Sequence, residues 1–286
     1  MKLSIITINY NNAEGLERTL NSVLTQSYKE IEHIIIDGGS TDGSVEVIKD
    51  YVNQLKNEDR RLKIDWVSEK DKGIYNAMNK GIKRASGEYI QILNSGDILA
   101  APDVTERMCT ELARLEIGDR TLENGVEILY GNMIKQWPDG KRLVDKCEAG
   151  NLSMLSFYHG TLNHDSAYIR RDLFEQFGLY DEKLKIVSDW KWYLQVIPLG
   201  GTTPVYVDID VTIFDMTGVS ESNTAFWKVE RRPVLEALVP PMILADYDKY
   251  GEDMRMMDRL RRHHLHGLVR FLERVLFKLE KWHILK

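Results

Sequence analysis

The first hundred residues alternate between two hydrophobic periods, and this alternation limits the possible folds more than any other feature of the chain. Leu3–Tyr10 and Ile31–Asp37 are apolar runs rich in β-branched residues, which is typical of strands buried on both faces. Further strands are expected at Lys63–Val67 and Glu88–Leu93, and the segments between strands carry apolar residues at helical spacing. This order predicts a parallel sheet with right-handed crossovers.

The second half of the chain is less regular. Strands are expected at Ile128–Tyr130, Lys141–Val144 and Val205–Phe214, with Pro138-Asp139-Gly140 as a turn between the first two. Helices are expected at Asp172–Phe177, at Ser188–Ile197 and over most of the chain from Phe226 onward. We therefore expect an α/β fold, in which a single Rossmann-like mixed sheet is flanked by helices and followed by a C-terminal helical extension.

Polar clusters follow three of the four expected strands. They are Thr7–Asn11, Asp37–Gly43 and Asn94–Asp97. Ligands of parallel α/β sheets bind beyond the carboxyl ends of the strands, where glycines admit a close backbone approach and helix N-termini present free N–H groups. One such turn is ordinary turn chemistry, but three at one edge favour a binding site.

Two common nucleotide-binding motifs are absent from the sequence. No G-x-G-x-x-G follows the first strand, which argues against a dinucleotide-binding Rossmann domain. No G-x-x-x-x-G-K-[ST] occurs either, which argues against a P-loop.

Long stretches of the chain resemble the family 2 glycosyltransferases. The first runs from Ser4 to Ser44 (SIITINYNNAEGLERTLNSVLTQSYKEIEHIIIDGGSTDGS), and SEKDKGIYNAMNKGIKRASGEYIQILNSGD continues the match. NHDSAYIRRDLF, IVSDWKWYLQVI and Phe214-Asp215-x-x-Gly218-x-Ser220 resemble the bacterial branch that builds surface polysaccharides. The resemblance implies a GT-A-type catalytic domain over residues 1–222, with a nucleotide-binding half (1–100) and an acceptor half (101–222), before the extension (223–286).

The resemblance also implies an inverting enzyme that takes a UDP-sugar as donor with Mn²⁺ or Mg²⁺. Asp97 would be the metal-binding carboxylate, and Asp189 would be the catalytic base. The residues that would line the nucleotide pocket are Thr7, Asn9, Asp37, Asp71, Gly73, Asn79, Lys80 and Asn94. The acceptor would be a glycan or a polyprenyl-diphosphate-linked sugar.

The chemistry of glycosyl transfer requires two carboxylates with separate tasks. A divalent cation with hard oxygen ligands neutralises the nucleoside diphosphate leaving group, and a second carboxylate takes the proton from the acceptor hydroxyl. The family's acidic motif usually reads Asp-x-Asp-Asp, whereas here Asn94-Ser95-Gly96-Asp97 retains only the last carboxylate. The sequence therefore does not identify the other ligands of the metal.

Three further residues are candidates for contact with the acceptor or with phosphate. His164 resembles part of an H-Q motif, here His164-Asp165, but it also fits a structural role. Arg170 could meet phosphate, and Trp190 could stack on a sugar or belong to the core. Asp189 itself begins an expected helix, where an aspartate is also a common capping residue.

The C-terminal region is basic in an otherwise acidic chain. Residues 255–286 hold nine Arg and Lys and three Asp and Glu, a net charge of +6. Because the whole chain has a net charge of −6, the remaining residues carry −12. An apolar stripe at helical spacing is formed by Leu265, Leu268, Val269, Leu272, Val275, Leu276, Leu279 and Trp282. This basic amphipathic helix has three interpretations: binding to an anionic membrane surface, packing on the catalytic domain, or homodimerisation.

No apolar run is long enough to span a membrane, and two cysteines are too few for a disulfide framework. We therefore expect a cytoplasmic protein, peripheral to the inner face of the membrane if its terminal helix binds there. Nucleic-acid binding is disfavoured, because the body is acidic. A nucleotidyltransferase would show a Gly-rich first loop with a catalytic Arg or Lys, which Ile8–Gly15 lacks. A non-catalytic nucleotide-sugar-binding protein remains the other alternative.

Overall fold

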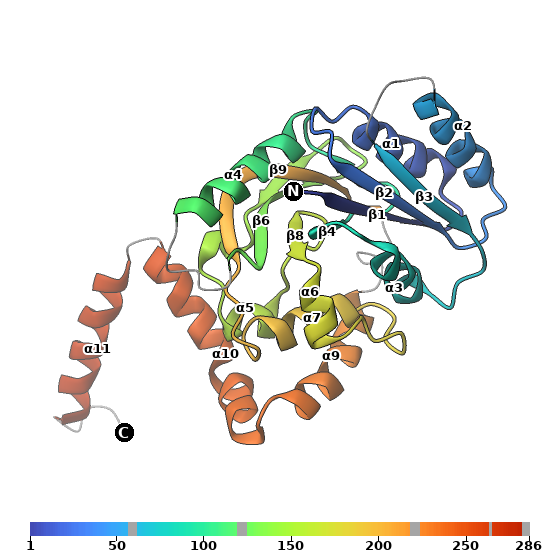
Figure 1. Ribbon diagram of the computed structural model, residues 1–286. Helices are drawn as coiled ribbons and strands as arrows, with labels where there is room; N and C mark the ends of the chain where they lie inside the picture. The colour runs from blue at the N-terminus through green and yellow to red at the C-terminus, as the bar shows by residue number, and fades with distance from the viewer. Residues whose placement is uncertain (57–61, 119–124, 218–223, 263–264, 282–286) are drawn as a thin grey trace. The chain divides into compact units, whose positions relative to one another are not determined.

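The computed structural model describes residues 1–56, 62–118, 125–217, 224–262 and 265–281. Within these residues, one mixed sheet holds the N-terminal body together (Figure 1). Its strands follow the order β3-β2-β1-β4-β8-β6-β9-β5, and β7 pairs with β6. Gly218 and Ser220 of the motif discussed above lie outside the described residues.

The first half of the chain forms the parallel part of the sheet. Its elements are β1 (Leu3–Asn9), α1 (Ala13–Leu24), β2 (Ile31–Asp37), α2 (Ser44–Lys56), β3 (Lys63–Ser68), α3 (Ile74–Arg84) and β4 (Tyr89–Ile92). Strand β1 pairs in parallel with β2 and β4, and β2 pairs in parallel with β3. The strand and helix alternation predicted from the sequence is confirmed, because every residue of β1 and β2 is buried as continuous apolar runs require.

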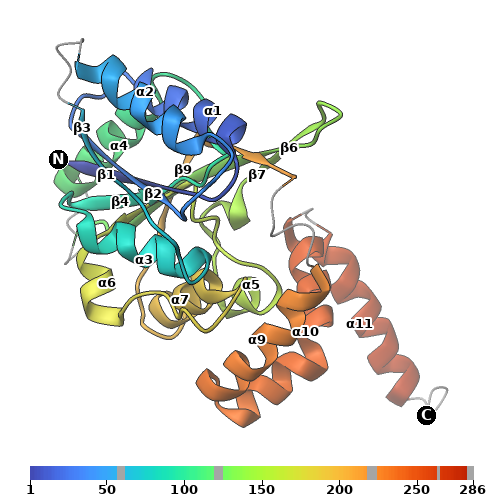
Figure 2. The ribbon, with the colours of Figure 1, turned by 90° about the vertical axis from the view of Figure 1, so that its right-hand side faces the viewer.

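Helices cover both faces of this parallel part. Helices α1 and α2 lie on one face and α3 lies on the other (Figure 2). On the first face, Leu20 of α1 and Ile48 of α2 pack with Ile35 of β2. On the opposite face Gly81 brings α3 very close to β1, since a Cβ atom there would lie 2.3 Å from Cγ2 of Ile6.

The second half extends the same sheet. Its elements are β5 (Ile98–Leu99), α4 (Val104–Gly118), β6 (Ile128–Gln136), β7 (Arg142–Asp145), a 3₁₀ helix (Cys147–Gly150), α5 (Met154–His159), β8 (Ala167–Arg170), α6 (Asp172–Phe177), α7 (Ser188–Val196) and β9 (Val205–Asp215). Strand β8 joins the halves by pairing antiparallel with both β4 and β6. It was not expected from the sequence, and both of its partner strands lie far from it along the chain.

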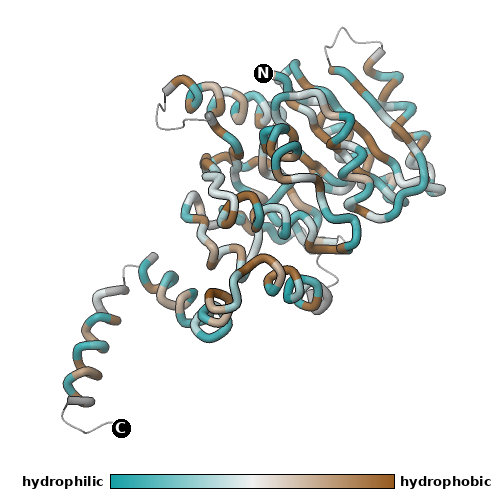
Figure 3. The backbone as a smooth tube through the Cα atoms, turned by 60° about the horizontal axis from the view of Figure 1, so that its bottom comes forward, coloured by the Kyte–Doolittle hydropathy of each residue, from teal (hydrophilic) through white to brown (hydrophobic). Residues whose placement is uncertain are grey.

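The remaining helices are α9 (Thr224–Leu238), α10 (Pro241–Arg262) and α11 (His266–Lys281). The chain divides into two compact units, Met1–Val234 and Leu235–Lys286. Along α11 hydrophobic and hydrophilic residues alternate (Figure 3), and the apolar side chains of Phe271 and Phe277 are 61% and 67% exposed. Trp282, expected in the same stripe, lies outside the described residues. Among the helices that can be described, none is both long and apolar enough to cross a membrane.

Candidate active site

The polar clusters at the ends of β1, β2 and β4 lie together at one edge of the sheet. Asn9 Nδ2 donates to Asp37 Oδ1 at 2.8 Å, which joins the ends of β1 and β2. Asn12 Nδ2 donates to the carbonyl oxygen of Ser95 at 3.1 Å, which joins the first cluster to the third. The edge is therefore assembled in the way that the parallel strand order predicts.

Asp37 organises the part of this edge that lies at the end of β2. Its carboxylate accepts hydrogen bonds from Ser40 Oγ (2.5 Å), Ser68 Oγ (2.6 Å) and the backbone N–H of Ser40 (3.0 Å). Burial raises the pKa of Asp37, but these bonds outweigh burial and hold the pKa below its ordinary value. The Asp37 carboxylate is therefore charged at neutral pH. Beside it, Oδ1 of Asn9 is buried and has no hydrogen-bond partner in the described part of the chain.

Thr7 does not reach the edge. Its side chain is fully buried, and Oγ1 lies 3.0 Å from Nε2 of His33. Burial lowers the pKa of His33 to about 3, so this histidine is neutral. Thr7 lies two residues before Asn9 on the same face of β1, so its side chain is inside the sheet. This position does not support the expected contact between Thr7 and the nucleotide.

The loop before α3 lines the same edge. Asp71 Oδ2 lies against Gly38, where a Cβ atom would be 3.2 Å away, and Asp71 also forms an ion pair with Lys80. Lys80 Nζ contacts Glu69 Oε1 at 2.8 Å as well, so a basic side chain stands beside the loop. Gly73 begins α3 with a φ of +123°, a value that favours glycine.

Asn79 is buried against the segment at Tyr180 and does not lie with Lys80 at the loop before α3. Its side chain is buried, donates to the carbonyl oxygen of Tyr180 at 2.9 Å and accepts from the backbone N–H of Tyr180 at 3.0 Å. Its Nδ2 also donates to Glu182 Oε1 at 3.0 Å. Asn79 therefore anchors the segment before α7 to α3 and is turned away from the expected nucleotide pocket.

Asp97 is buried just beyond β4. Its Oδ1 accepts a hydrogen bond from the backbone N–H of Asp215 at 3.0 Å, so the start of β5 and the end of β9 meet here. Burial and the negative charge of Asp165 raise the pKa of Asp97 well above its ordinary value. Asp215 Oδ2 accepts from Arg18 Nη2 at 3.1 Å.

Asp97 and Asp215 supply carboxylate oxygens of the kind that would hold a divalent cation. Mg²⁺ is commonly held by one or two carboxylates together with substrate phosphates, and positive charge would relieve the cost of keeping Asp97 ionised in a buried place. No cluster of three His, Cys, Asp or Glu side chains arranged for a metal is found among the described residues, so protein ligands alone do not complete such a site. Asp97 and Asp215 are the residues that would hold the ion.

Asp189 lies in the first turn of α7. Its Oδ1 accepts a hydrogen bond from the hydroxyl of Tyr75 at 2.8 Å, and its Oδ2 lies 3.2 Å from His164 Nδ1. Burial raises the pKa of Asp189, but the bond and charge of His164 and the bond from Tyr75 outweigh it and lower the pKa. The side chain remains 14% exposed, so Asp189 is a charged carboxylate that solvent or substrate can reach.

His164 connects the two carboxylate regions. Its Nε2 lies 3.1 Å from Asn94 Nδ2, and Asn94 is three residues from Asp97. Burial lowers the pKa of His164, but the hydrogen bond and charge of Asp189 raise it to about 9. A histidine protonated on both nitrogens needs an acceptor at Nε2, which the amide oxygen of Asn94 supplies when the amide is turned over.

Two of the candidates for acceptor contact do not lie at this edge. Arg170 is at the far end of β8, opposite Tyr89 in register, and its guanidinium pairs with Glu127 at 3.3 Å and Asp172 at 2.7 Å. Trp190 is 1% exposed, and its Nε1 donates to the carbonyl oxygen of Phe157 at 2.7 Å. The helical turn that presents Asp189 directs Trp190 into the core, so stacking of Trp190 on a sugar is not supported.

Tyr75 bonds to Asp189, Asp215 bonds to Asp97, and Arg231 of α9 lies close enough to Asp189 to interact with its charge, but none of the three was identified as a site residue from the sequence. Tyr75 follows Gly73 in the first turn of α3, so its place at a helix start beyond a strand was a usable signal. Asp215 was noted in the sequence only as part of the Phe214-Asp215-x-x-Gly218-x-Ser220 motif. Nothing in the sequence distinguished Arg231 from other arginines of its helix.

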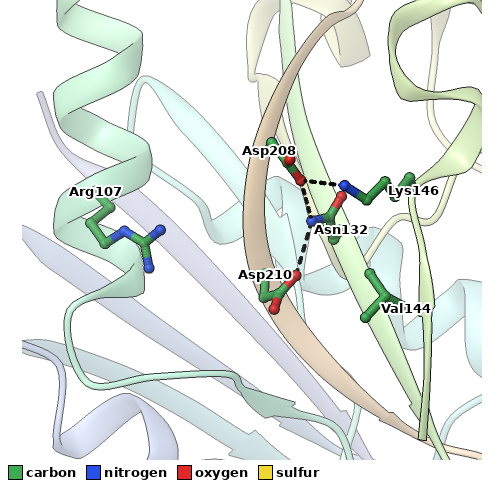
Figure 4. A pocket seen from close by; sticks show the side chains of 6 residues that line it. All are labelled: Arg107, Asn132, Val144, Lys146, Asp208 and Asp210. Carbon is green, nitrogen blue, oxygen red and sulfur yellow. Dashed lines mark hydrogen bonds and ion pairs between the residues drawn. The ribbon is translucent and has the colours of Figure 1, made fainter.

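A separate polar pocket of about 380 Å³ lies elsewhere on the sheet (Figure 4). Asp208 and Asp210 of β9 both accept hydrogen bonds from Asn132 Nδ2 at 2.9 Å, and Lys146 Nζ pairs with Asp208 at 2.8 Å. Arg107 and Val144 also line it, but neither Asp97 nor Asp189 does. Lys146 and Asp208 form an ion pair in it, and Asp210 bonds to the neutral amide of Asn132.

Comparison with solved structures supports the fold. Staphylococcus aureus TarS (residues 1–349) in complex with UDP-GlcNAc matches with a TM-score of 0.62 and 20% identity over 81% of this chain and 65% of that one. Mannosyltransferase PcManGT of Pyrobaculum calidifontis in complex with GDP-Man and Mn²⁺ matches with a TM-score of 0.58 and 18% identity over 80% and 60%. The chain thus spans about three fifths to two thirds of these matched structures, which have GT-A-type folds.

Comparison of sequences identifies the family. An uncharacterized glycosyltransferase of Mycobacterium tuberculosis is 30% identical over 245 residues, covering 83% of this chain and 85% of the relative. A PGL/p-HBAD biosynthesis glycosyltransferase of Mycobacterium bovis is 26% identical over 221 residues, covering 77% and 79%. The model of glycosyl transferase family 2 matches residues 4–176, and the chain therefore belongs to glycosyl transferase family 2.

Proposed function

We propose that this glycosyltransferase moves a sugar from a nucleoside diphosphate donor to a hydroxyl group of a glycan or lipid-linked acceptor, with inversion at the anomeric carbon. The observation that carries the proposal is the Asn94–His164–Asp189 chain of contacts, which links the buried Asp97 to a second, ionised carboxylate. Inverting transfer in one displacement needs a leaving-group site and a base on opposite sides of the anomeric carbon. Asp97 and Asp189 fit these two tasks.

Asp189 would take the proton from the acceptor hydroxyl as the new glycosidic bond forms. The hydrogen bonds from Tyr75 and His164 fix the carboxylate in one orientation and keep it ionised. A carboxylate accepts up to about four hydrogen bonds, so both oxygens retain capacity for the acceptor hydroxyl. Asp189 is thus the catalytic base in this proposal, and Tyr75 and His164 are positioning residues.

A divalent cation held by Asp97 and Asp215 would supply Lewis-acid stabilisation of the diphosphate leaving group. Asn9, Asp37, Asp71, Gly73 and Lys80 would surround the nucleoside, because they line the adjoining part of the edge. UDP-sugar is the donor we favour, and the UDP-GlcNAc complex of the structural neighbour TarS supports that choice. The GDP-Man complex of PcManGT makes a GDP-sugar the first donor to compare.

A polyprenyl-diphosphate-linked sugar in surface-glycan synthesis is the acceptor we favour. The PGL/p-HBAD biosynthesis name of the mycobacterial relative is consistent with lipid-linked glycan chemistry. The exposed apolar residues of α11, together with Arg270, Arg274 and Lys278, support peripheral binding to an anionic membrane on the cytoplasmic side. Packing of this helix in a homodimer is the competing proposal.

The test is release of nucleoside diphosphate from a panel of UDP- and GDP-sugars, with Mn²⁺ or Mg²⁺ and without added acceptor. We expect metal-dependent turnover with one donor, and a loss of roughly 100-fold or more in Asp97→Asn. Asp210→Asn is the matched control, because it removes one charge from the same sheet outside the site. The proposal fails if turnover is equal with and without metal, or if Asp97→Asn behaves like Asp210→Asn.

A further inference from the structure

Arg231 of α9 has an unusual environment for an arginine. Its Cζ atom lies 4.5 Å from the centre of the Trp190 ring and 4.6 Å from the centre of the Trp227 ring. Such cation–π contacts hold the guanidinium plane in place without using its N–H donors. The two rings therefore hold the Arg231 side chain in position and leave its N–H groups able to donate hydrogen bonds.

Two donor atoms of Arg231 are buried without a partner in the described part of the chain. Within the residues that the structure describes, neither Nε nor Nη1 has a hydrogen-bond partner, and both atoms are inaccessible to solvent. A buried unpaired donor costs free energy, more so when it carries charge. Burial lowers the pKa of Arg231 to about 10, so the guanidinium remains charged at neutral pH, while no carboxylate among the described residues bonds to its Nε or Nη1.

Hydrogen bonds of the neighbouring residue also fix the position of Arg231. Its neighbour Glu230 accepts hydrogen bonds from the backbone N–H groups of Lys185 (2.8 Å) and Ile186 (3.0 Å). These two residues directly precede α7, which carries Asp189 in its first turn. Helix α9 is thereby tied to the segment that carries Asp189, and the negative charge of Asp189 acts on Arg231.

The side of the active site on which Arg231 lies decides what it can bind. In an inverting displacement the leaving diphosphate and its cation are opposite the base. Glu230, next to Arg231, bonds to the segment directly before Asp189, so Arg231 belongs to the side from which the acceptor enters. An anion that pairs with Arg231 is therefore part of the acceptor and not of the donor.

We infer that Arg231 binds a phosphate group of the acceptor substrate, and that the enzyme selects acceptors in which a phosphate lies near the hydroxyl that receives the sugar. This inference rests on the proposed glycosyl transfer and names the chemical class of its acceptor. Arginine suits this task because its planar N–H groups bind two phosphate oxygens at once. Trp190 and Trp227 act here as supports for the guanidinium.

The experiment measures phosphate binding when the donor site is already filled. The full chain is saturated with UDP and Mn²⁺, and inorganic phosphate is titrated against the fluorescence of the tryptophans that flank Arg231, with NaCl at matched ionic strength as the blank. The variants are Arg231→Gln, Arg231→Lys and the matched control Arg232→Gln, a neighbouring exposed arginine on the same helix. Calorimetric titration with UDP, and thermal melting, are run on all four proteins.

We expect the wild type and Arg232→Gln to respond to phosphate with the same midpoint. Arg231→Gln raises that midpoint by roughly tenfold or more, and Arg231→Lys lies between them, because lysine keeps the charge and loses the planar donors. The affinity for UDP is unchanged throughout. Retention of the phosphate response in a folded Arg231→Gln protein overturns the inference, and so does a parallel loss of UDP affinity, which would assign Arg231 to the donor diphosphate.

Failure of the underlying proposal gives a different pattern. A wild-type protein that binds neither UDP nor any other nucleoside diphosphate refutes the proposed glycosyl transfer, and the acceptor inference falls with it. A wild-type protein that binds UDP but shows no response to phosphate leaves glycosyl transfer intact and refutes only the role of Arg231.

Discussion

Replacing Asp189 with asparagine tests the electrostatic pairing at the centre of the site. In the wild type the bond and charge of Asp189, followed by the charges of Asp165 and Asp97, raise the pKa of His164 from 6.5 to about 9 against the opposing effect of burial. That difference corresponds to about 3 kcal/mol of preference for the charged histidine when the fold is intact. Asparagine keeps the shape and removes the charge, so the pKa of His164 should fall toward or below 6.5 in Asp189→Asn.

The sign of the pH dependence follows from both partners. The raised pKa of His164 contributes stability that is fully present below pH 6.5 and is lost as the pH rises through about 9. The lowered pKa of Asp189 contributes stability that is present above its ordinary value of 3.8 and is lost as the pH falls through the folded value. The stability advantage of wild type over Asp189→Asn should therefore be greatest between about pH 4 and 6.5 and decline toward pH 9.

The assay combines nuclear magnetic resonance with kinetics. The ring nitrogens of His164, assigned with His164→Gln, are titrated in wild type and Asp189→Asn, and transfer to acceptor is measured in parallel. Loss of a general base should lower kcat by roughly 100- to 10,000-fold, while the Kd for the nucleotide stays unchanged. A His164 pKa that remains near 9 in Asp189→Asn would falsify the pairing, and an undiminished kcat would remove Asp189 from the role of base.

Two further predictions concern stability and membrane binding. Burial raises the pKa of Glu32, but bonds from Ser86 and Ser4 lower it to about 2, so Glu32→Gln should lose up to about 3 kcal/mol in urea unfolding at pH 7. The loss should shrink as the pH falls below 4.5 toward 2, and a pH-independent difference would contradict this reasoning. The full chain should sediment with phosphatidylglycerol vesicles and not with phosphatidylcholine vesicles, and a double variant, Phe271→Asp with Phe277→Asp, should remain in the supernatant. Equal sedimentation of the double variant and wild type would exclude α11 as the membrane contact.

The parallel half of the sheet could be predicted from the sequence because its signals are local. Apolar β-branched runs, helical spacing and Gly/Ser/Asp turns each depend on neighbouring residues, and right-handed crossovers order the strands. Ile31–Asp37 was predicted with the bounds that the structure has, and Asp37 was expected at the edge where it lies. The second half was harder, since β8 is short and pairs only with distant strands.

The assignment of side chains to the edge or the core was decided by tertiary structure. Thr7 and Asn9 occupy the same face of β1, yet only Asn9 reaches the edge, because the depth of a residue in the sheet depends on the neighbouring strands. Asn79 and Lys80 are adjacent in α3, but the segment at Tyr180 covers one and leaves the other near Asp71. No local pattern encodes these differences.

The sequence by itself determined the family and the parallel half of the sheet, and it singled out Asp97 and Asp189 as candidates, because these depend on local periodicity and on motifs. Only the tertiary structure brought Tyr75 and His164 to Asp189, and Arg231 to Trp190. Those contacts join residues from 25 to 114 positions apart, so they form only when the packed core has fixed the separate elements in space.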